Sequence, residues 1–387
     1  MMWIGACTSS IGTWMQVVAQ NWLVYEMSKN NPRYLAIDSF LGQIPIVALA
    51  LLSGVIADRR SRRHILLTSQ YIQMTCAFTL AALYFAGVLQ VWQVWCLSFT
   101  VGAAQAFGGP AYSALIPTLV AKQDLPNAIA LNSIQFNLAR VIGPSLGGIA
   151  LAYLGATWCF TLNGFSFLAV IATLYMITVS FTPAKSSEPM LESMKQGIRF
   201  IRARSGMVAL IALAFLMTFF GFPLLAFMPV FAKEVYKGGS GTFTLLLVCS
   251  GLGSVCGALA MAWLGRLKKQ GRTLLAALSL LGVLMIGFSL APSLPIACVM
   301  IYLCGATLMS VFSMVASLVQ LITPDDMRGR VMSVYNLAFR GGGPFGTLVA
   351  GYFIPRFTAP VTIACAGVGM ILLGATFLLT QKRVTDL

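Results

Sequence analysis

Long apolar runs, separated by short polar segments, recur along the whole chain. A helix needs about 20 mainly apolar residues to cross the hydrocarbon core of a bilayer. Only 9% of the residues are charged, compared with about 25% in a soluble globular domain. The alternating strands of about 10 residues that a transmembrane barrel would need are absent from the pattern. The sequence therefore predicts an all-α integral membrane protein.

Twelve of the apolar runs are long enough to cross a membrane. We expect spans near residues 4–27, 34–57, 65–88, 92–119, 126–153, 157–181, 207–232, 241–264, 273–290, 294–322, 331–354 and 360–380. Most of the 25 lysines and arginines lie in alternate loops, and cytoplasmic loops are enriched in these residues. Both termini and the central loop are therefore expected in the cytoplasm. We interpret the net charge of +15 as a topology signal and predict no nucleic-acid partner.

The widest interruption of the apolar pattern is residues 182–206, which separates two halves of six predicted spans, 1–181 and 207–387. Apolar residues recur in it at helical spacing, namely Leu191, Met194, Ile198 and Ile201. This spacing predicts an amphipathic linker helix on the cytoplasmic leaflet.

The fifth spans of the two halves carry related stretches, NLARVIGPSLGG at 137–148 and NLAFRGGGPFGT at 336–347. Each contains a Gly-Pro pair and an arginine. Two equal halves in parallel are a common plan for secondary transporters, whose substrate site lies near the midplane between them. The repeat therefore predicts a transporter with twelve transmembrane helices in two pseudo-symmetric six-helix halves.

The loop after the second predicted span reads GVIADRRSRRH, residues 54–64. It resembles the signature loop of the major facilitator superfamily, G-x-x-x-D-R-x-x-R-R, with Ser61 in place of the usual glycine. The resemblance implies a cytoplasmic latch that closes one conformation against span 11, formed by Gly54, Asp58, Arg59, Arg62 and Arg63. The alternative is that these charges only fix the topology.

The motif R-x-x-G-P-x-x-G-G at 140–148 resembles the span-5 motif of exporters in that superfamily. Glycines four residues apart let helices approach closely in lipid, and proline bends a helix. We predict hinge and packing positions at Gly143, Pro144, Gly147, Gly253, Gly257, Gly343 and Pro344. The glycine pair of span 8 offers a surface that could pair with the one in span 5. Packing without a hinge is the alternative.

Three longer stretches, IGTWMQVVAQNWLVYE, PNAIALNSIQFNLARVIGPSLGG and PDDMRGRVMSVYNLAFRGGGPFG, resemble the enterobactin-exporter-like branch, the transmembrane secretion effector group. The resemblance implies proton-driven efflux of a small amphipathic molecule, siderophore-like or drug-like, across a bacterial inner membrane. It also implies a functional monomer without a cofactor. Members of this group have a short segment before the first span, and this chain has almost none, so we expect a start that is short of the usual one.

Arg140 and Arg340 lie near the middle of their predicted spans. An arginine at that depth is costly unless it faces water or a partner. We expect at least one of them to reach a central cavity and to favour anionic substrates. The alternative is that Arg140 binds freed carbonyls where its helix contacts another.

Polar residues on one face of the first predicted span are spaced as on a helix, ending with Gln16 and Gln20. In the superfamily this span borders the cavity, so both are substrate-contact candidates. Weaker candidates are Gln105, Asn132 and Gln135. Hydrogen bonding between helices is an equal alternative for each.

Asp38 and Glu26 are the candidates for proton coupling, although a solvated position at the rim of the membrane is the interpretation that we favour for both. The chain shows no catalytic constellation and no metal-ligand spacing, so no enzyme, metal or cofactor is predicted. An uptake symporter and a transport-dead receptor or scaffold are the rival functions.

Overall fold

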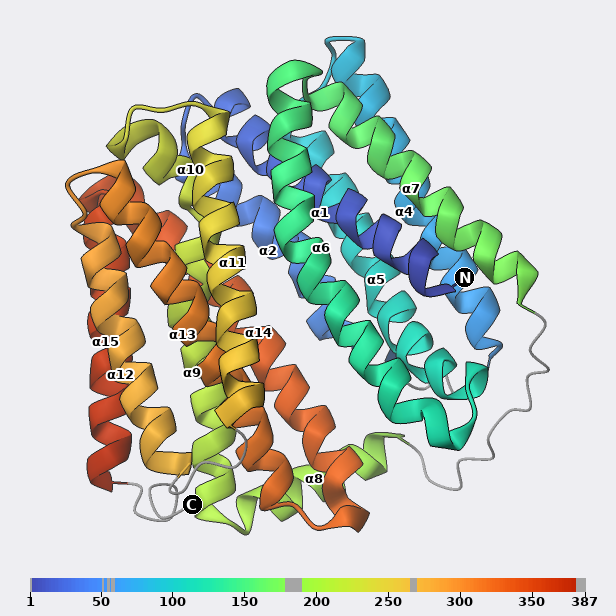
Figure 1. Cartoon of the computed structure of the whole chain (residues 1–387), viewed down its shortest axis with the longest axis vertical. Helices are drawn as coiled ribbons and strands as arrows, with labels where there is room; N and C mark the ends of the chain where they lie inside the picture. Colours follow the sequence, from blue (N-terminus) through green and yellow to red (C-terminus); the bar gives the residue numbers. More distant parts are fainter. Residues whose placement is uncertain are drawn as a thin grey trace. The chain divides into compact units, whose positions relative to one another are not determined.

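The computed structural model describes residues 2–50, 52–53, 56, 60–177, 190–264 and 270–380. Within these ranges the chain is helical and contains no strand (Figure 1). A helix satisfies every backbone hydrogen bond inside one segment, as a membrane interior without water requires. Contacts divide the chain into two compact units, Met1–Met190 and Leu191–Leu387.

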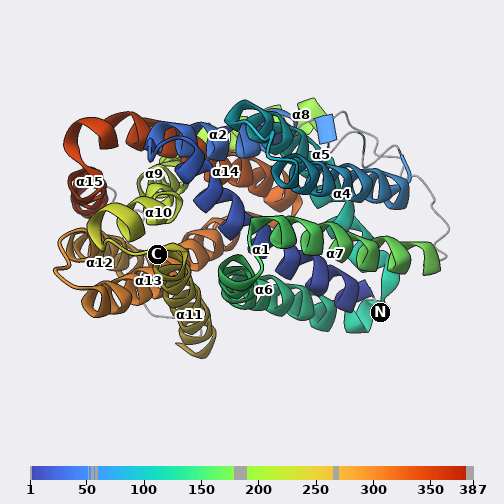
Figure 2. The same cartoon turned by 90° about the horizontal axis from the view of Figure 1, so that it is seen from above.

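The first unit has six long helices in its described part. They and one short 3-10 turn are α1 (Met2–Met27), α2 (Pro32–Ala48), α4 (Arg62–Phe85), α5 (Val91–Leu119), η1 (Lys122–Asp124), α6 (Leu125–Tyr153) and α7 (Ala156–Met176). Helix α1 packs along both α6 and α7, α4 packs along α5 and α7, and α2 packs along α5 (Figure 2). This arrangement places α1 against helices that come much later in the sequence.

The second unit is again built from long helices. Its elements are α8 (Met190–Arg202), α9 (Ser205–Ala226), α10 (Met228–Val230), the π-helical turn η2 (Phe231–Val235), α11 (Ser240–Leu264), α12 (Gln270–Ser289), α13 (Leu294–Leu321), α14 (Asp325–Phe357) and α15 (Ala359–Thr380). The predicted span near 207–232 is interrupted at Phe227. Pro223 and Pro229 flank this residue and remove backbone donors from the helix ladder.

The main helix pairings are the same in both units. The first long helix packs along the fifth (α1 with α6, α9 with α14), and the second along the fourth (α2 with α5, α11 with α13). The third packs along the sixth (α4 with α7, α12 with α15). The sequence repeat in the fifth spans is thus accompanied by a repeat in packing.

Seven helices in the described part of the chain are long and apolar enough to cross a membrane, by length and composition. They are Arg62–Phe85, Ala156–Met176, Gly206–Val235, Ser240–Trp263, Gln270–Ser289, Leu294–Leu321 and Ala359–Thr380. Helices α1, α6 and α14 are as long, but they contain the amides and arginines singled out above, which lower their mean hydropathy. These features show a multi-pass helical membrane protein.

The linker contains the helix α8, where the apolar spacing predicts one, and its place on the cytoplasmic leaflet stays a prediction. Its Gly197 lies against the backbone of Arg330 at the start of α14, since an added Cβ would be 2.9 Å from the Arg330 carbonyl oxygen. Ile201, one turn later, is buried. Part of α8 therefore packs on the start of α14, whereas Lys195 and Arg199 are exposed.

The predicted glycine pairs lie at seams inside each unit, that is, at places where two helices come into close backbone contact. Gly143 and Gly147 of α6 face α1, where added Cβ atoms would meet Ile11 O at 2.9 Å and the Met15 Cα at 2.9 Å. Gly253 and Gly257 of α11 instead face α13. Their surface is occupied there, so the expectation that the two pairs pack on each other is wrong.

A seam of the same kind lies between α14 and α9. An added Cβ at Gly343 would lie 3.0 Å from the Phe222 ring, and one at Gly346 would overlap the Phe219 carbonyl oxygen. Pro344 lies buried between these two glycines. The two Gly-Pro stretches of the sequence repeat therefore occupy equivalent seams, α6 with α1 and α14 with α9.

The variant Gly257→Ala is expected to destabilise the protein, because its Cβ would overlap the carbonyl oxygen of Ala306. Overpacking of this kind costs about 1–3 kcal/mol. The control is Gly241→Ala on the same helix, where nothing lies within 4 Å of the added Cβ. Alanine is favoured over glycine in a helix, so this control should not lower the thermal unfolding midpoint of the purified protein in detergent. Equal unfolding midpoints for the two variants would contradict the close contact between α11 and α13 at Gly257.

Candidate functional site

Asp38 lies in the second turn of α2 and is buried in the first unit, with 4% of its surface exposed. Its carboxylate accepts hydrogen bonds from the Ser98 hydroxyl (2.6 Å) and from the Gln20 amide (2.9 Å). The helix starts at Pro32, after an Asn31 side chain that caps it. Because α2 packs along α5, this register turns Asp38 inward.

The interpretation of Asp38 as a solvated rim residue is therefore wrong. Glu26, at the end of α1, is exposed and fits that interpretation. Of the acidic side chains that the structure describes, Asp38 alone is buried. An isolated carboxylate is costly to bury, and the two neutral donors are what compensate this one.

Gln16 and Gln20 of the polar face of α1 form one hydrogen-bonded chain with Asp38. The amide of Gln16 donates to Gln20 Oε1 (3.4 Å), and Gln20 also donates to Ser98 Oγ (2.9 Å). On the other side, the Asn163 amide of α7 donates to Gln16 Oε1 (2.6 Å). This chain of hydrogen-bonded side chains thus links α2, α5, α1 and α7.

Two members of this chain, Ser98 and Asn163, were not identified by the sequence analysis. Each lies in a largely apolar stretch of α5 or α7, near other small polar residues, and each is buried. A polar side chain at that depth requires a partner. This requirement is a usable signal, but it cannot name the partner, because the partner lies on another helix.

The weaker candidates also take part in contacts between helices. Gln135 of α6 is buried and donates to Ser10 Oγ (2.7 Å) and to the Ala6 carbonyl oxygen (3.1 Å) of α1. Gln105 of α5 donates to Gln73 Oε1 of α4 at 3.2 Å. Both side chains therefore tie helices together, as the alternative interpretation proposed. Asn132 is half-buried on α6.

Arg140 on α6 is half-buried and Arg340 on α14 is exposed. In the described part of the chain, no hydrogen bond or ion pair reaches either guanidinium. Arg340 continues an exposed polar stripe with Ser333 and Asn336, at spacings of three and four residues along α14. Membrane helices expose such a stripe mainly toward water or protein. Gly341 and Gly342, next to it, are buried against α9.

Of the predicted latch, Gly54, Asp58 and Arg59 lie outside the described residues. Arg62 donates to the Ala114 carbonyl oxygen of α5 at 2.9 Å, and Arg63 donates to the Tyr175 carbonyl oxygen of α7 at 3.3 Å. These bonds fasten the start of α4 to the later parts of α5 and α7. Cationic side chains are favourable at the C-terminal end of a helix such as α7.

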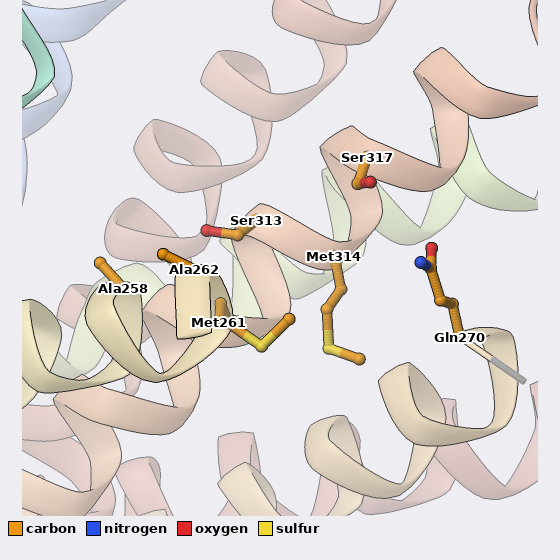
Figure 3. Close-up of a pocket in the computed structure, with 7 residues that line it drawn as sticks. All are labelled: Ala258, Met261, Ala262, Gln270, Ser313, Met314 and Ser317. Atoms are coloured by element: carbon orange, nitrogen blue, oxygen red, sulfur yellow. The ribbon is translucent and has the colours of Figure 1, made fainter. Parts of the chain in front are cut away.

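A cavity of about 270 Å³ lies in the second unit, between α11, α13 and the start of α12 (Figure 3). Its lining residues are Ala258, Met261, Ala262, Gln270, Ser313, Met314 and Ser317. None of the residues predicted to contact substrate contributes to it.

Comparisons with solved structures agree with this architecture. A POT family transporter in complex with 5-aminolevulinic acid aligns with a TM-score of 0.76 at 13% identity, over 99% of this chain and 96% of that one. A bacterial homologue of the iron transporter ferroportin, in an inward-facing state, aligns with a TM-score of 0.75 at 14% identity, over 97% of each. At these identities the likeness shows the fold alone.

Sequence relatives cover most of the chain. The multidrug efflux pump Tap of Mycolicibacterium fortuitum is 24% identical, over 99% of this chain and 95% of its own. The staphyloferrin A transporter of Staphylococcus aureus is 23% identical, over 97% and 94%. The enterobactin exporter EntS of Escherichia coli is 27% identical, over 85% and 79%. All three are transporters.

The family described as transmembrane secretion effector matches residues 1–387, the full length of the sequence. The match agrees with the signature loop, with the glycine seams and with the transporter fold of the solved neighbours. The chain therefore belongs to the transmembrane secretion effector family of the major facilitator superfamily.

Proposed function

We propose that the protein is a proton-coupled secondary exporter of a small amphipathic molecule, siderophore-like or drug-like and with anionic character. The observation that carries this proposal is Asp38, a buried carboxyl group held by two neutral donors. Binding a proton there changes the charge of a buried group, and this change shifts the conformational equilibrium when the two states hydrate the group differently. A proton moving inward can thereby drive export.

The proposed architecture has twelve spans in two six-helix halves, 1–181 and 207–387, joined by the linker 182–206. The repeated helix pairings support it. Both termini lie in the cytoplasm of a bacterial inner membrane, as the distribution of basic residues indicates. The halves alternate between inward-open and outward-open states around a central site, and the protein acts as a monomer.

The anionic character of the substrate rests on Arg140 and Arg340. Both guanidiniums are without a partner among the described residues, and Arg340 lies on the polar stripe of α14. A carboxylate or catecholate can take hydrogen bonds from such a group in a planar, bidentate geometry. The named siderophore substrates of two relatives are compatible with this class.

The loop from Gly54 to Arg63 acts as the cytoplasmic latch in this proposal. The bonds of Arg62 and Arg63 to α5 and α7 support it, because they fix the start of α4 within its unit. In this proposal Asp58 is the acidic residue of the signature loop. The Gly-Pro stretches of α6 and α14 serve as the seams about which helices adjust.

The variant Asp38→Asn is expected to abolish substrate accumulation driven by an imposed pH gradient in inverted membrane vesicles. The asparagine cannot exchange a proton, but it preserves the size of the side chain. Counterflow, which needs only substrate exchange, should persist. Asp124→Asn is the control, since Asp124 is an exposed acid of the same unit. Glu26→Gln is measured beside them, to test the other candidate.

Undiminished gradient-driven accumulation in Asp38→Asn would reject the coupling role of Asp38. If Glu26→Gln abolished it instead, the coupling site would move to the end of α1. Counterflow without any response to the gradient in the wild-type protein would favour a facilitator over a proton-coupled exporter.

Arg340→Gln is expected to reduce accumulation of an anionic catecholate by about tenfold or more, because a charge-assisted hydrogen bond contributes about 1.5–3 kcal/mol. Transport of a cationic dye should be unaffected. The control is Arg356→Gln on the same helix, whose guanidinium lies over the Tyr352 ring, 3.9 Å from the ring centroid. Equal transport of the anion by both variants would show that Arg340 does not contact the substrate.

A further inference from the structure

The hydrogen-bonded chain that ends at Asp38 has a single direction. The Ser166 hydroxyl lies 3.1 Å from Asn163 Oδ1, and the Asn163 amide nitrogen donates to Gln16 Oε1 (2.6 Å). The Gln16 nitrogen donates to Gln20 Oε1 (3.4 Å), and the Gln20 nitrogen donates to Asp38 Oδ2 (2.9 Å). Each of the three amides therefore points its donor toward the carboxylate.

This direction is a physical consequence of the charge at one end. An ionised carboxylate only accepts hydrogen bonds, so Gln20 must present its nitrogen and leave its oxygen to Gln16. The same requirement then passes to Gln16 and to Asn163. A protonated carboxyl group can donate as well as accept, so it tolerates either direction of the chain. The hydrogen-bonded side chains thus stabilise the ionised form of Asp38 selectively.

The far end of the chain is fixed by packing around Asn163. This residue has 3% of its surface exposed. Its Oδ1 lies against Gly12 of α1, where an added Cβ would be 2.8 Å from that oxygen. The oxygen thereby faces Gly12 and Ser166, and the nitrogen is left to face Gln16. Gly12 is the position that lets α7 bring Asn163 so close to α1.

We propose that Asn163 is a positioning residue for the protonation of Asp38, and that it acts through Gln16 and Gln20. Asn163 sets the orientation of both glutamine amides, so that Gln20 offers its donor to the carboxylate. The inference rests on the proposed function in one respect, namely that Asp38 exchanges the coupled proton. It adds that α7 takes part in setting when that proton binds.

The side chains that bind the Asp38 carboxylate carry no charge. Its hydrogen-bond partners, Ser98 and Gln20, are neutral. The titratable or charged side chains of the described parts of α1, α2 and α5 are Cys7, Tyr25, Glu26, Arg33, Tyr34, Cys96 and Tyr112. Both hydrogen bonds described for the carboxylate come from neutral side chains instead. The neutral hydrogen-bonded side chains are therefore neighbours that can tune the proton equilibrium of Asp38.

The test is the pH titration of the Asp38 carboxyl group in the purified full-length protein. Difference infrared spectroscopy measures the carbonyl band of a protonated carboxyl, and its loss in Asp38→Asn assigns the band. Asn163→Leu keeps the branched shape of the side chain but removes the donor to Gln16, so the ionised form loses support. The midpoint should move to higher pH by about half to one unit, a three- to tenfold gain in proton affinity.

Gln16→Met breaks the chain one bond closer to Asp38, and its shift should be at least as large. Gln16→Met also serves as the test variant if Asn163→Leu does not insert or fold. The matched control is Gln73→Met. Gln73 is also a buried amide of the first unit, but its bonds run to Ser69 and Gln105. This control should leave the midpoint unchanged.

Unchanged midpoints in Asn163→Leu and Gln16→Met, with a shifted midpoint in Gln20→Met, would overturn the inference and leave proton coupling at Asp38 intact. A carboxyl band that does not respond to pH in the wild-type protein would overturn both. A shift in Gln73→Met as large as in Asn163→Leu would also overturn the inference, because it would show a general effect of losing a buried amide.

Discussion

The constraint behind most of this structure is that a polar group inside a membrane protein must find its partner within the protein. The backbone meets it by forming helices. Many hydroxyl groups meet it within one turn, as Thr13 does by donating to the Ser9 carbonyl oxygen, whereas Ser98 donates to Asp38 on another helix. Several longer polar side chains also bind across helices, as Gln20 does to Asp38 and Asn163 does to Gln16. The chain from Asn163 to Asp38 is the most extended result.

Close approach of helices makes these bonds possible. Gln135 can reach the α1 backbone because Gly143 and Gly147 let α6 lie directly on α1. Asn163 can reach Gln16 because Gly12 gives it space. Glycine positions and amide positions are thus parts of one arrangement. A change at either is expected to disturb the other.

The two units share their helix pairings but differ in what lies at the seams. In the first unit the interior contains amides and one carboxyl group. In the second, aromatic rings take that place, with Phe312 packed against Phe222 and Phe339 at centroid distances of 6.4 and 4.8 Å. Arg340 lies beside this cluster in sequence. The repeated scaffold therefore carries a buried carboxyl group with its amides in one unit and an aromatic cluster in the other.

The sequence by itself determined the helical membrane class, the repeat and the family. Apolar length, the distribution of basic residues and the Gly-Pro motifs are local properties, and they survive without knowledge of neighbours. It also singled out Gln16, Gln20 and Asp38, but as separate candidates. Only the tertiary structure decided that Asp38 is buried, that Gln20 binds it and that Asn163 binds Gln16. The physical reason is that burial and hydrogen bonding across helices depend on rotation and register, which a one-residue shift would change and which no local pattern encodes.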